Sequence, residues 1–189
     1  VKPNLEKSLV EELFIFTKSQ WEKSSENVLK EIKNKFKSDI VVRSSSLIED
    51  SHAFSFAGFF YSELNIDSQN LTQVERAISK VIKSYSKHER ASQDDQILVQ
   101  SQTQNVVYSG VVFTRNIQNN GPYYLINYDK SRITDSVTSG KVGNKLEIAR
   151  NLDIENLNSI WKSLIESIKE IEGLLHNLAL DIEFAINES

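Results

Sequence analysis

The sequence of 189 residues contains no cysteine and no methionine, and only two prolines and six glycines. Without cysteine, the chain has no disulfide, no thiolate metal site and no cysteine nucleophile. No apolar run approaches the roughly 20 residues that span a bilayer, and no secretory signal is recognisable. We therefore expect no membrane partner and a cytoplasmic location. Because even position 1 lacks methionine, we also expect a piece cut at both ends from a longer polypeptide.

A basic stripe is missing as well. The net charge is -4, the isoelectric point is about 5.5, and lysines and arginines are scattered among acids, which argues against a nucleic-acid partner. Neither G-x-x-x-x-G-K-[S/T] nor G-x-G-x-x-G occurs, so P-loop, protein-kinase and Rossmann interpretations lose their main support. The hydrophobic content of 39% is enough for one core or two small lobes.

Apolar residues recur at helical spacing in three regions of the chain. The first region predicts two helices between residues 5 and 36, with a break near Ser19. The second predicts a helix that begins at Leu71, with Asn70 and Gln73 as a capping pair. The third predicts a long helix that starts at Asp153.

Strand-like segments occupy much of the remaining chain, and short polar turns at 104–105 and 119–121 favour antiparallel pairing of consecutive strands. The fold class is therefore α+β, a mostly antiparallel sheet flanked by helices. We expect residues 1–38 to form a helical lead-in and 39–189 the main domain. The expected strands are 40–43, 59–66, 97–102, 106–115, 122–128, 134–138 and 180–186.

The most informative stretch is V-R-S-S-S-L-I-E-D at 42–50. An apolar strand delivers Arg43 to an edge, where its guanidinium can fork onto phosphate oxygens while Ser44 and backbone amides supply further donors. The stretch therefore predicts a nucleotide-phosphate site. An alternative stays open, in which Arg43 is a loop residue paired with Glu49 or Asp50.

Two carboxylates share one face of the last expected strand. Alternation places Asp181 and Glu183 opposite the apolar residues 180, 182, 184 and 186. Oxygen ligands on a rigid strand suit magnesium, which takes one or two carboxylates together with substrate phosphates and water. The alternative is a solvated strand face without a ligand.

A further polar strand end lies at 97–102. The backbone of Gln100, Ser101 and Gln102 could offer hydrogen bonds to the edge of an adenine ring. Gly110, in the next expected strand, would let a ring approach closely. This pattern is weak by itself, since hairpins with one glycine are common.

Taken in order, these pieces resemble the ATP-binding domain of the phosphoenolpyruvate synthase and pyruvate phosphate dikinase family, which has an ATP-grasp fold. The resemblance covers residues 38–187. It is carried by V-R-S-S-x-x-x-E-D at 42–50, S-F-A-G-x-x-x-S at 55–62, L-N-I at 64–66, V-Q at 99–100, S-G-V-x-F-T-R at 109–115 and D-I-E-F-A-I at 181–186.

The resemblance implies ATP and magnesium as cofactors and assigns roles to individual residues. Arg43 would bind the ATP phosphates, and Gly58 with Ser62 would form the loop over them. Residues 100–102 would line the adenine edge. Glu183 would coordinate magnesium, with Asp181 beside it.

The resemblance also implies an activity. Such enzymes pass a phosphoryl group from ATP through a histidine on another domain to a small acceptor and release AMP and phosphate. Phosphohistidine and acceptor domains are therefore expected elsewhere in the same polypeptide, and we expect this fragment to be inactive alone.

The sequence departs from the family where many members have a G-L-G-E loop, because residues 132–140 read R-I-T-D-S-V-T-S-G. This departure puts pyruvate in doubt as the acceptor. It resembles instead a branch that includes the glutamine kinase of capsular phosphoramidate synthesis, a capsule biosynthesis pathway. An alternative function is a degenerate ATP-grasp module that binds nucleotide without catalysis.

Overall fold

The structure is a computed structural model that describes residues 4–45, 61–85, 92–130 and 143–187. The chain divides into two compact units. The first unit comprises residues 11–103, and the second comprises 1–10 together with 104–189. The boundary expected at residue 38 does not coincide with this division. Antiparallel sheets and helices in both units confirm the α+β class.

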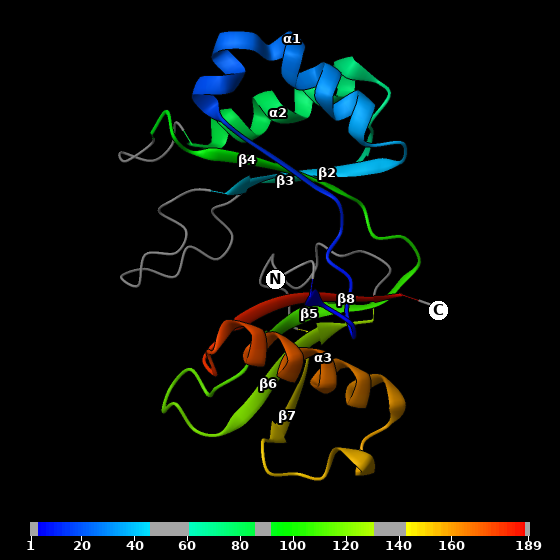
Figure 1. Cartoon of the computed structure of the whole chain (residues 1–189), viewed down its shortest axis with the longest axis vertical. Helices are drawn as coiled ribbons and strands as arrows, with labels where there is room; N and C mark the ends of the chain where they lie inside the picture. Colours follow the sequence, from blue (N-terminus) through cyan, green and yellow to red (C-terminus); the bar gives the residue numbers. More distant parts are fainter. Residues whose placement is uncertain (1–3, 46–60, 86–91, 131–142, 188–189) are drawn as a thin grey trace. The chain divides into compact units, whose positions relative to one another are not determined.

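The first unit is a four-stranded antiparallel sheet in the order β1-β4-β2-β3. Its two helices lie on the same side of this sheet (Figure 1). The elements are β1 Leu13–Thr17, α1 Lys18–Lys35, β2 Asp39–Ser45, β3 Ser62–Asp67, α2 Leu71–Tyr85 and β4 Gln96–Ser101. We call the opposite side of the sheet the open face of the first unit.

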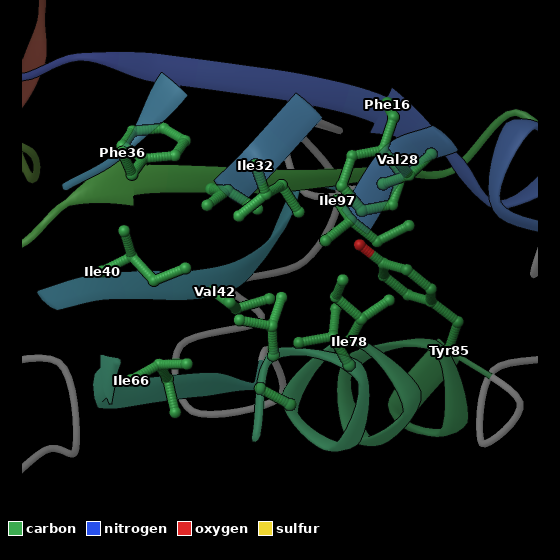
Figure 2. Close-up of a cluster of buried hydrophobic side chains, with 14 residues drawn as sticks. Phe16, Val28, Ile32, Phe36, Ile40, Val42, Ile66, Ile78, Tyr85 and Ile97 are labelled. Carbon is green, nitrogen blue, oxygen red and sulfur yellow. The ribbon is translucent and has the colours of Figure 1, made fainter. Parts of the chain in front are cut away.

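The core of the first unit lies between the sheet and the helices (Figure 2). Side chains at every second position of β2 and β4 are directed into it, including Ile40 and Val42 from β2 and Ile97 from β4, which are all fully buried. Helix α2 contributes Ile78 and the almost fully buried Tyr85. The period of two along the strands leaves the intervening side chains on the open face.

The prediction of the first of two helices over residues 5–36 is wrong. Residues 13–17 form strand β1, which pairs with β4 from Leu13↔Gln100 to Thr17↔Gln96. The aromatic and β-branched sequence L-F-I-F-T suits a strand, and the pairing with β4 decides between the two periods. Helix α1 follows at once, with Thr17 and Gln20 forming a capping box.

The helix expected from Leu71 is confirmed, but of its expected capping pair only Asn70 acts as the cap. The backbone amide of Gln73 donates to Oδ1 of Asn70 at 3.2 Å. The Gln73 side-chain amide, however, donates to the carbonyl oxygen of Asn65 at 3.2 Å. The cap is therefore a single hydrogen bond accepted by the Asn70 side chain, and the Gln73 side chain instead links α2 to β3.

The second unit is also a four-stranded antiparallel sheet, in the order β7-β6-β5-β8 (Figure 1). Helix α3 packs against one side of it, through a core that includes Val112, Ile126 and Ile165. We call the other side the open face of the second unit. The elements are β5 Val106–Phe113, β6 Tyr123–Asp129, β7 Asn144–Ala149, a 3-10 turn Ile154–Asn156, α3 Ser159–Leu175 and β8 Asp181–Asn187.

Two expectations for this region are corrected and one is confirmed. Strands β5 and β6 form the hairpin expected around residues 119–121. Strand β4 does not pair with β5, because the two belong to different sheets. The third helix begins at Ser159 rather than Asp153, since Asn158 caps it. Strand β7 was not expected, and the strand expected at 134–138 lies outside the described residues.

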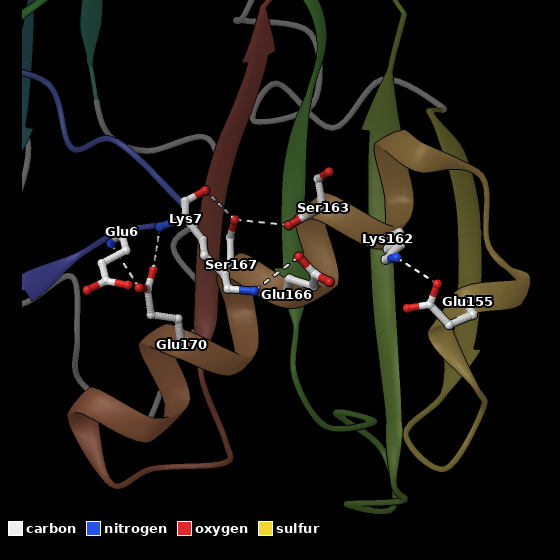
Figure 3. A network of polar contacts seen from close by, with 8 residues as sticks. All are labelled: Glu6, Lys7, Glu155, Lys162, Ser163, Glu166, Ser167 and Glu170. Atoms are coloured by element: carbon white, nitrogen blue, oxygen red, sulfur yellow. Dashed lines mark hydrogen bonds and ion pairs between the residues drawn. The ribbon is translucent and has the colours of Figure 1, made fainter.

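The chain's first described residues belong to the second unit, where they lie along α3 (Figure 3). The carboxylate of Glu170 accepts the backbone amides of Glu6 and Lys7 at 2.8 and 3.1 Å. Lys7 forms an ion pair with Glu166 at 3.1 Å, and Ser167 Oγ donates to the Lys7 carbonyl oxygen at 2.8 Å. These contacts fix residues far apart in sequence within one unit.

Candidate functional site

Arg43 lies on strand β2, on the open face of the first unit. Its neighbours across the sheet are Ser62 on β3 and Leu98 on β4. Arg43 is half-buried, whereas Ser62 is exposed. Because directly paired residues of antiparallel strands project to the same face, the guanidinium and the Ser62 hydroxyl are on one side of the sheet. The structure therefore brings together two of the residues predicted to bind phosphate.

Ser44 has a different environment. Its side chain is directed toward the helices, is 2% exposed, and has a hydroxyl with no hydrogen-bond partner in the described part of the chain. Its backbone amide donates to the carbonyl oxygen of Tyr61 at 3.1 Å. The Ser44 hydroxyl thus lies on the face opposite the Arg43 side chain, so the two cannot bind one ligand from the same side. Gly58 lies outside the described residues.

A polar network that sequence reasoning missed lies beside this strand pair. The carboxylate of Glu63 accepts hydrogen bonds from Tyr61 Oη and from Lys80 Nζ, and the latter is also an ion pair. Partial burial raises the pKa of Glu63, but the bonds from Lys80 and Tyr61 lower it below its usual value. The bond to Glu63 also raises the pKa of Lys80. The network fixes Tyr61, whose carbonyl accepts the Ser44 amide.

The three residues expected to line an adenine edge have separate environments. Gln100 is paired with Val41 on the open face. The backbone amides of Ser101 and Gln102 donate to the carbonyl oxygens of Glu12 and Asp39, at 3.1 and 2.9 Å. These two amide donors are therefore already used within the first unit.

The side chain of Gln102 also has a structural contact. It accepts the backbone amide of Asn65 at 2.6 Å and donates to Asn65 Oδ1 at 2.7 Å. Asn65 has a φ of 57° and lies where the β2–β3 register shifts, so it forms a bulge in β3. Gln102 stabilises this bulge, and of the three residues Gln100 is the one whose side chain shares a face with Arg43.

The carboxylates of Asp181 and Glu183 lie on β8, on the open face of the second unit. They are exposed, whereas the alternating Ile182, Phe184 and Ile186 pack against the core. The expected alternation is confirmed. Partial burial raises the pKa of Asp181, and repulsion from the Glu183 carboxylate raises it further. The two negative charges are therefore close enough to interact.

One comparison with known proteins identifies the family. Residues 10–142 match the family described as pyruvate phosphate dikinase, AMP/ATP-binding domain. The chain belongs to this family. As a member of it, the chain is an AMP/ATP-binding part of a dikinase-type enzyme. No curated protein matches the sequence. None of the helices that the structure describes is both long and apolar enough to cross a membrane.

Some candidate residues of this dikinase-family domain lie inside the range that matches the family, and others lie outside it. The matched range contains the whole first unit, with Arg43, Ser62 and Gln100, but it ends before β8. The nucleotide-phosphate candidates therefore lie within the range that defines the family. The metal candidates Asp181 and Glu183 depend on the geometry of β8 alone.

The carboxylates of β8 fit a magnesium ion whose other ligands are nucleotide phosphates and water. Within the described ranges, no group of three or more His, Cys, Asp or Glu residues is arranged to hold a metal. Asp181 and Glu183 supply two carboxylates, which is the number magnesium takes when nucleotide phosphates and water complete its shell. Burial and then repulsion from Glu183 raise the pKa of Asp181, and a bound cation would relieve that repulsion.

Gly110 does not provide the opening that its sequence context suggested. A Cβ atom built there would lie 2.1 Å from the carbonyl oxygen of Asn127 and 3.0 Å from the ring of Phe184. The ring that approaches Gly110 closely thus belongs to the protein itself. The glycine allows β6 and Phe184 to pack against β5.

Proposed function

We propose that this domain binds ATP with magnesium, with Arg43 on the phosphates and the Asp181–Glu183 pair on the metal. The observation that carries the proposal is the position of Arg43. It lies on the open face of a strand that is paired on both sides, opposite the exposed hydroxyl of Ser62, and inside the range matched by the AMP/ATP-binding family. A cation held on a rigid strand favours an anionic ligand at that face.

Each residue has a defined chemical part in this proposal. The Arg43 guanidinium offers a planar set of donors for two phosphate oxygens, and the Ser62 hydroxyl offers another donor beside it. The carboxylates of Asp181 and Glu183 would hold magnesium, which supplies positive charge to neutralise the phosphates. Gly58 remains a predicted contact to phosphate, and Gln100 remains a predicted contact to adenine. Phosphoryl transfer depends mainly on positioning and charge neutralisation of this kind.

The proposal extends to the whole polypeptide. A histidine on another domain would receive the phosphoryl group and pass it to a small acceptor, with AMP and phosphate as the other products. The altered loop sequence at 132–140, which lies outside the described residues, favours a glutamine-like acceptor over pyruvate. The expected setting is cytoplasmic and the expected pathway is capsule biosynthesis.

Arg43→Ala tests the phosphate assignment. Loss of a charged donor that contacts phosphate should weaken binding of a non-hydrolysable ATP analogue about 100-fold, equivalent to roughly 3 kcal/mol. Isothermal titration calorimetry with magnesium present measures it. The control is Lys30→Ala, which removes the same charge from the exposed side of α1. Equal affinities for the two variants would contradict the assignment.

A product assay separates catalysis from nucleotide binding alone. The full-length polypeptide should release AMP from ATP in the presence of its acceptor, whereas an ordinary kinase or a ligase would release ADP. A polypeptide that binds ATP through Arg43 but releases neither nucleotide would fit the degenerate module instead. Chromatographic separation of AMP and ADP gives the answer.

A further inference from the structure

Thr114 directly follows β5 and uses all of its hydrogen-bonding groups on other parts of the second unit. It is fully buried. Its amide donates to the Leu180 carbonyl oxygen at 2.9 Å, and its Oγ1 accepts the Leu180 amide at 2.8 Å. The same hydroxyl donates to the Leu178 carbonyl oxygen at 2.9 Å. Thr114 therefore binds the residues immediately before β8 by three hydrogen bonds.

The remaining group of Thr114, its carbonyl oxygen, accepts Nη1 of Arg150 at 2.9 Å. Arg150 is itself fixed by Glu172 of α3, through bonds of 2.6 and 2.8 Å from Nη1 and Nη2. The Glu172 side chain is 3% exposed, and the Arg150 guanidinium lies 4.5 Å from the ring centre of Tyr124. A bidentate, buried pair of this kind leaves little freedom to the guanidinium. It anchors Thr114 to the body of the unit.

This arrangement has a direct consequence for the carboxylates on β8. Leu180 precedes Asp181, and Asp181 is paired with Phe113, the neighbour of Thr114. The connection between α3 and β8 is mostly exposed, and the bonds to Thr114 hold its last residues at the start of β8. A slip of one residue in β8 would turn Asp181 and Glu183 toward the core face, because strand side chains alternate.

We propose that Thr114, held by Arg150, is a positioning residue for the metal-binding carboxylates Asp181 and Glu183. The inference rests on the proposed magnesium role of those two residues. Thr114 contacts neither nucleotide nor metal. It acts by fixing the register of β8, so that both carboxylates stay on the open face at a constant separation.

Thr114→Val tests the proposal because valine keeps the branched shape and loses the hydroxyl. We expect the magnesium concentration that half-saturates ATP-analogue binding to rise about tenfold, as is typical when a residue that orients metal ligands is lost. Backbone amides of 181–183 should exchange hydrogen faster. Thr114→Ser, which restores the hydroxyl, should return both quantities to within about twofold of the parent.

Two further variants accompany Thr114→Val: the first is a control for general loss of stability, and the second is an independent test. Ser167→Ala removes a buried hydroxyl whose partners are the carbonyl oxygens of Lys7 and Ser163 in the same unit, rather than the residues before β8. It should lower the melting temperature without changing the magnesium requirement. Arg150→Lys keeps the charge beside Glu172, but an ammonium group cannot form the same bidentate bonds to the carboxylate. It should therefore shift the magnesium requirement in the same direction as Thr114→Val. It provides the test if Thr114→Val does not fold.

The outcomes separate this inference from the proposed function. If the parent chain binds the analogue equally well with and without magnesium, the magnesium role fails, and the positioning role with it. If the parent requires magnesium and Thr114→Val, or Arg150→Lys in its place, leaves that requirement unchanged, only the positioning role is overturned. A shifted requirement that Thr114→Ser does not restore would also overturn it.

Discussion

The two units use the same architecture for opposite chemistry. Each is a four-stranded antiparallel sheet with helices on one side and an open face on the other. On the open face of the first unit lies a half-buried cation, Arg43, and on that of the second lies a pair of carboxylates, Asp181 and Glu183. The comparison indicates that a sheet covered by helices on one side can present charge of either sign on the other, and that residues at alternate strand positions set this sign.

The cores behind these faces differ as well. In the first unit, the hydroxyl of the buried Tyr85 accepts the Ser45 amide at 3.0 Å and donates to the Gln96 carbonyl oxygen. This unit also buries Asp95, whose carboxylate accepts the Ser92 amide at 2.7 Å. In the second unit, the buried carboxylate of Glu172 is paired with the guanidinium of Arg150, whose side chain is 17% exposed. Loss of the Glu172 carboxylate should cost more than loss of a single neutral hydrogen bond such as that of Tyr85, because it leaves the charge of Arg150 without its partner.

Glu172→Ala should have the largest effect on stability. It leaves the Arg150 guanidinium without its carboxylate, which typically costs about 3–5 kcal/mol for a buried pair. Urea unfolding measures the loss. Glu147→Ala, at an exposed position of β7 in the same unit, is the control and should change stability by less than about 0.5 kcal/mol. A loss for Glu172→Ala as small as that of the control would remove the contrast between the two cores.

Sequence reasoning succeeded where a local pattern coincided with the final pairing. The alternation along 181–186 and the Asn70 cap are such cases, since both depend on neighbours within a few residues. It failed for residues 13–17, where helical spacing and β propensity conflict and the distant β4 decides. It also failed at 104–105, because a short polar turn does not reveal that the next strand belongs to another sheet.

The candidate site was predictable to a similar extent. Arg43 and Ser62 are found across from each other on β2 and β3, as two motifs of one sequence region suggested. Ser44 follows Arg43 directly on β2, so the alternation of side chains along a strand directs it to the opposite face, toward the helices. The phosphate hypothesis did not take this alternation into account. Glu63–Lys80 and Arg150–Glu172 had no recognisable signal, because their partners lie 17 and 22 residues apart on different elements.

Glu183→Gln should have a moderate effect, on magnesium rather than on stability. The amide keeps the shape of the side chain but loses the charge that a divalent cation requires, so magnesium-dependent binding of an ATP analogue should weaken about tenfold. Glu147→Gln, on β7 of the same open face, is the matched control. Titration with magnesium at fixed analogue concentration measures both. Equal responses would mean that β8 carries no special metal site and that the open faces differ only in charge.

The smallest expected effects concern stability against pH, and they should have opposite signs in the two units. The raised pKa of Asp181 means that the folded chain binds its proton more readily than the unfolded chain. Stability therefore falls as pH rises through the window between its usual and raised pKa, and Asp181→Asn should be slightly more stable at pH 7. The lowered pKa of Glu63 has the reverse consequence. Its contribution is present above the usual carboxyl pKa and is lost as pH falls through the lowered value, so Glu63→Gln should be less stable at pH 7.

Both changes should be modest, about 0.5 kcal/mol, because these side chains are partly solvated and screened by salt. Urea unfolding of the two variants and the parent chain at pH 7 and again near pH 4 measures them. For each variant, the difference from the parent should shrink at the lower pH, where more of the parent's carboxyl group is protonated. A less stable Asp181→Asn at pH 7 would mean that the Asp181 carboxylate already has a compensating partner in the folded chain, and the second unit would then need no cation to relieve the repulsion on its open face.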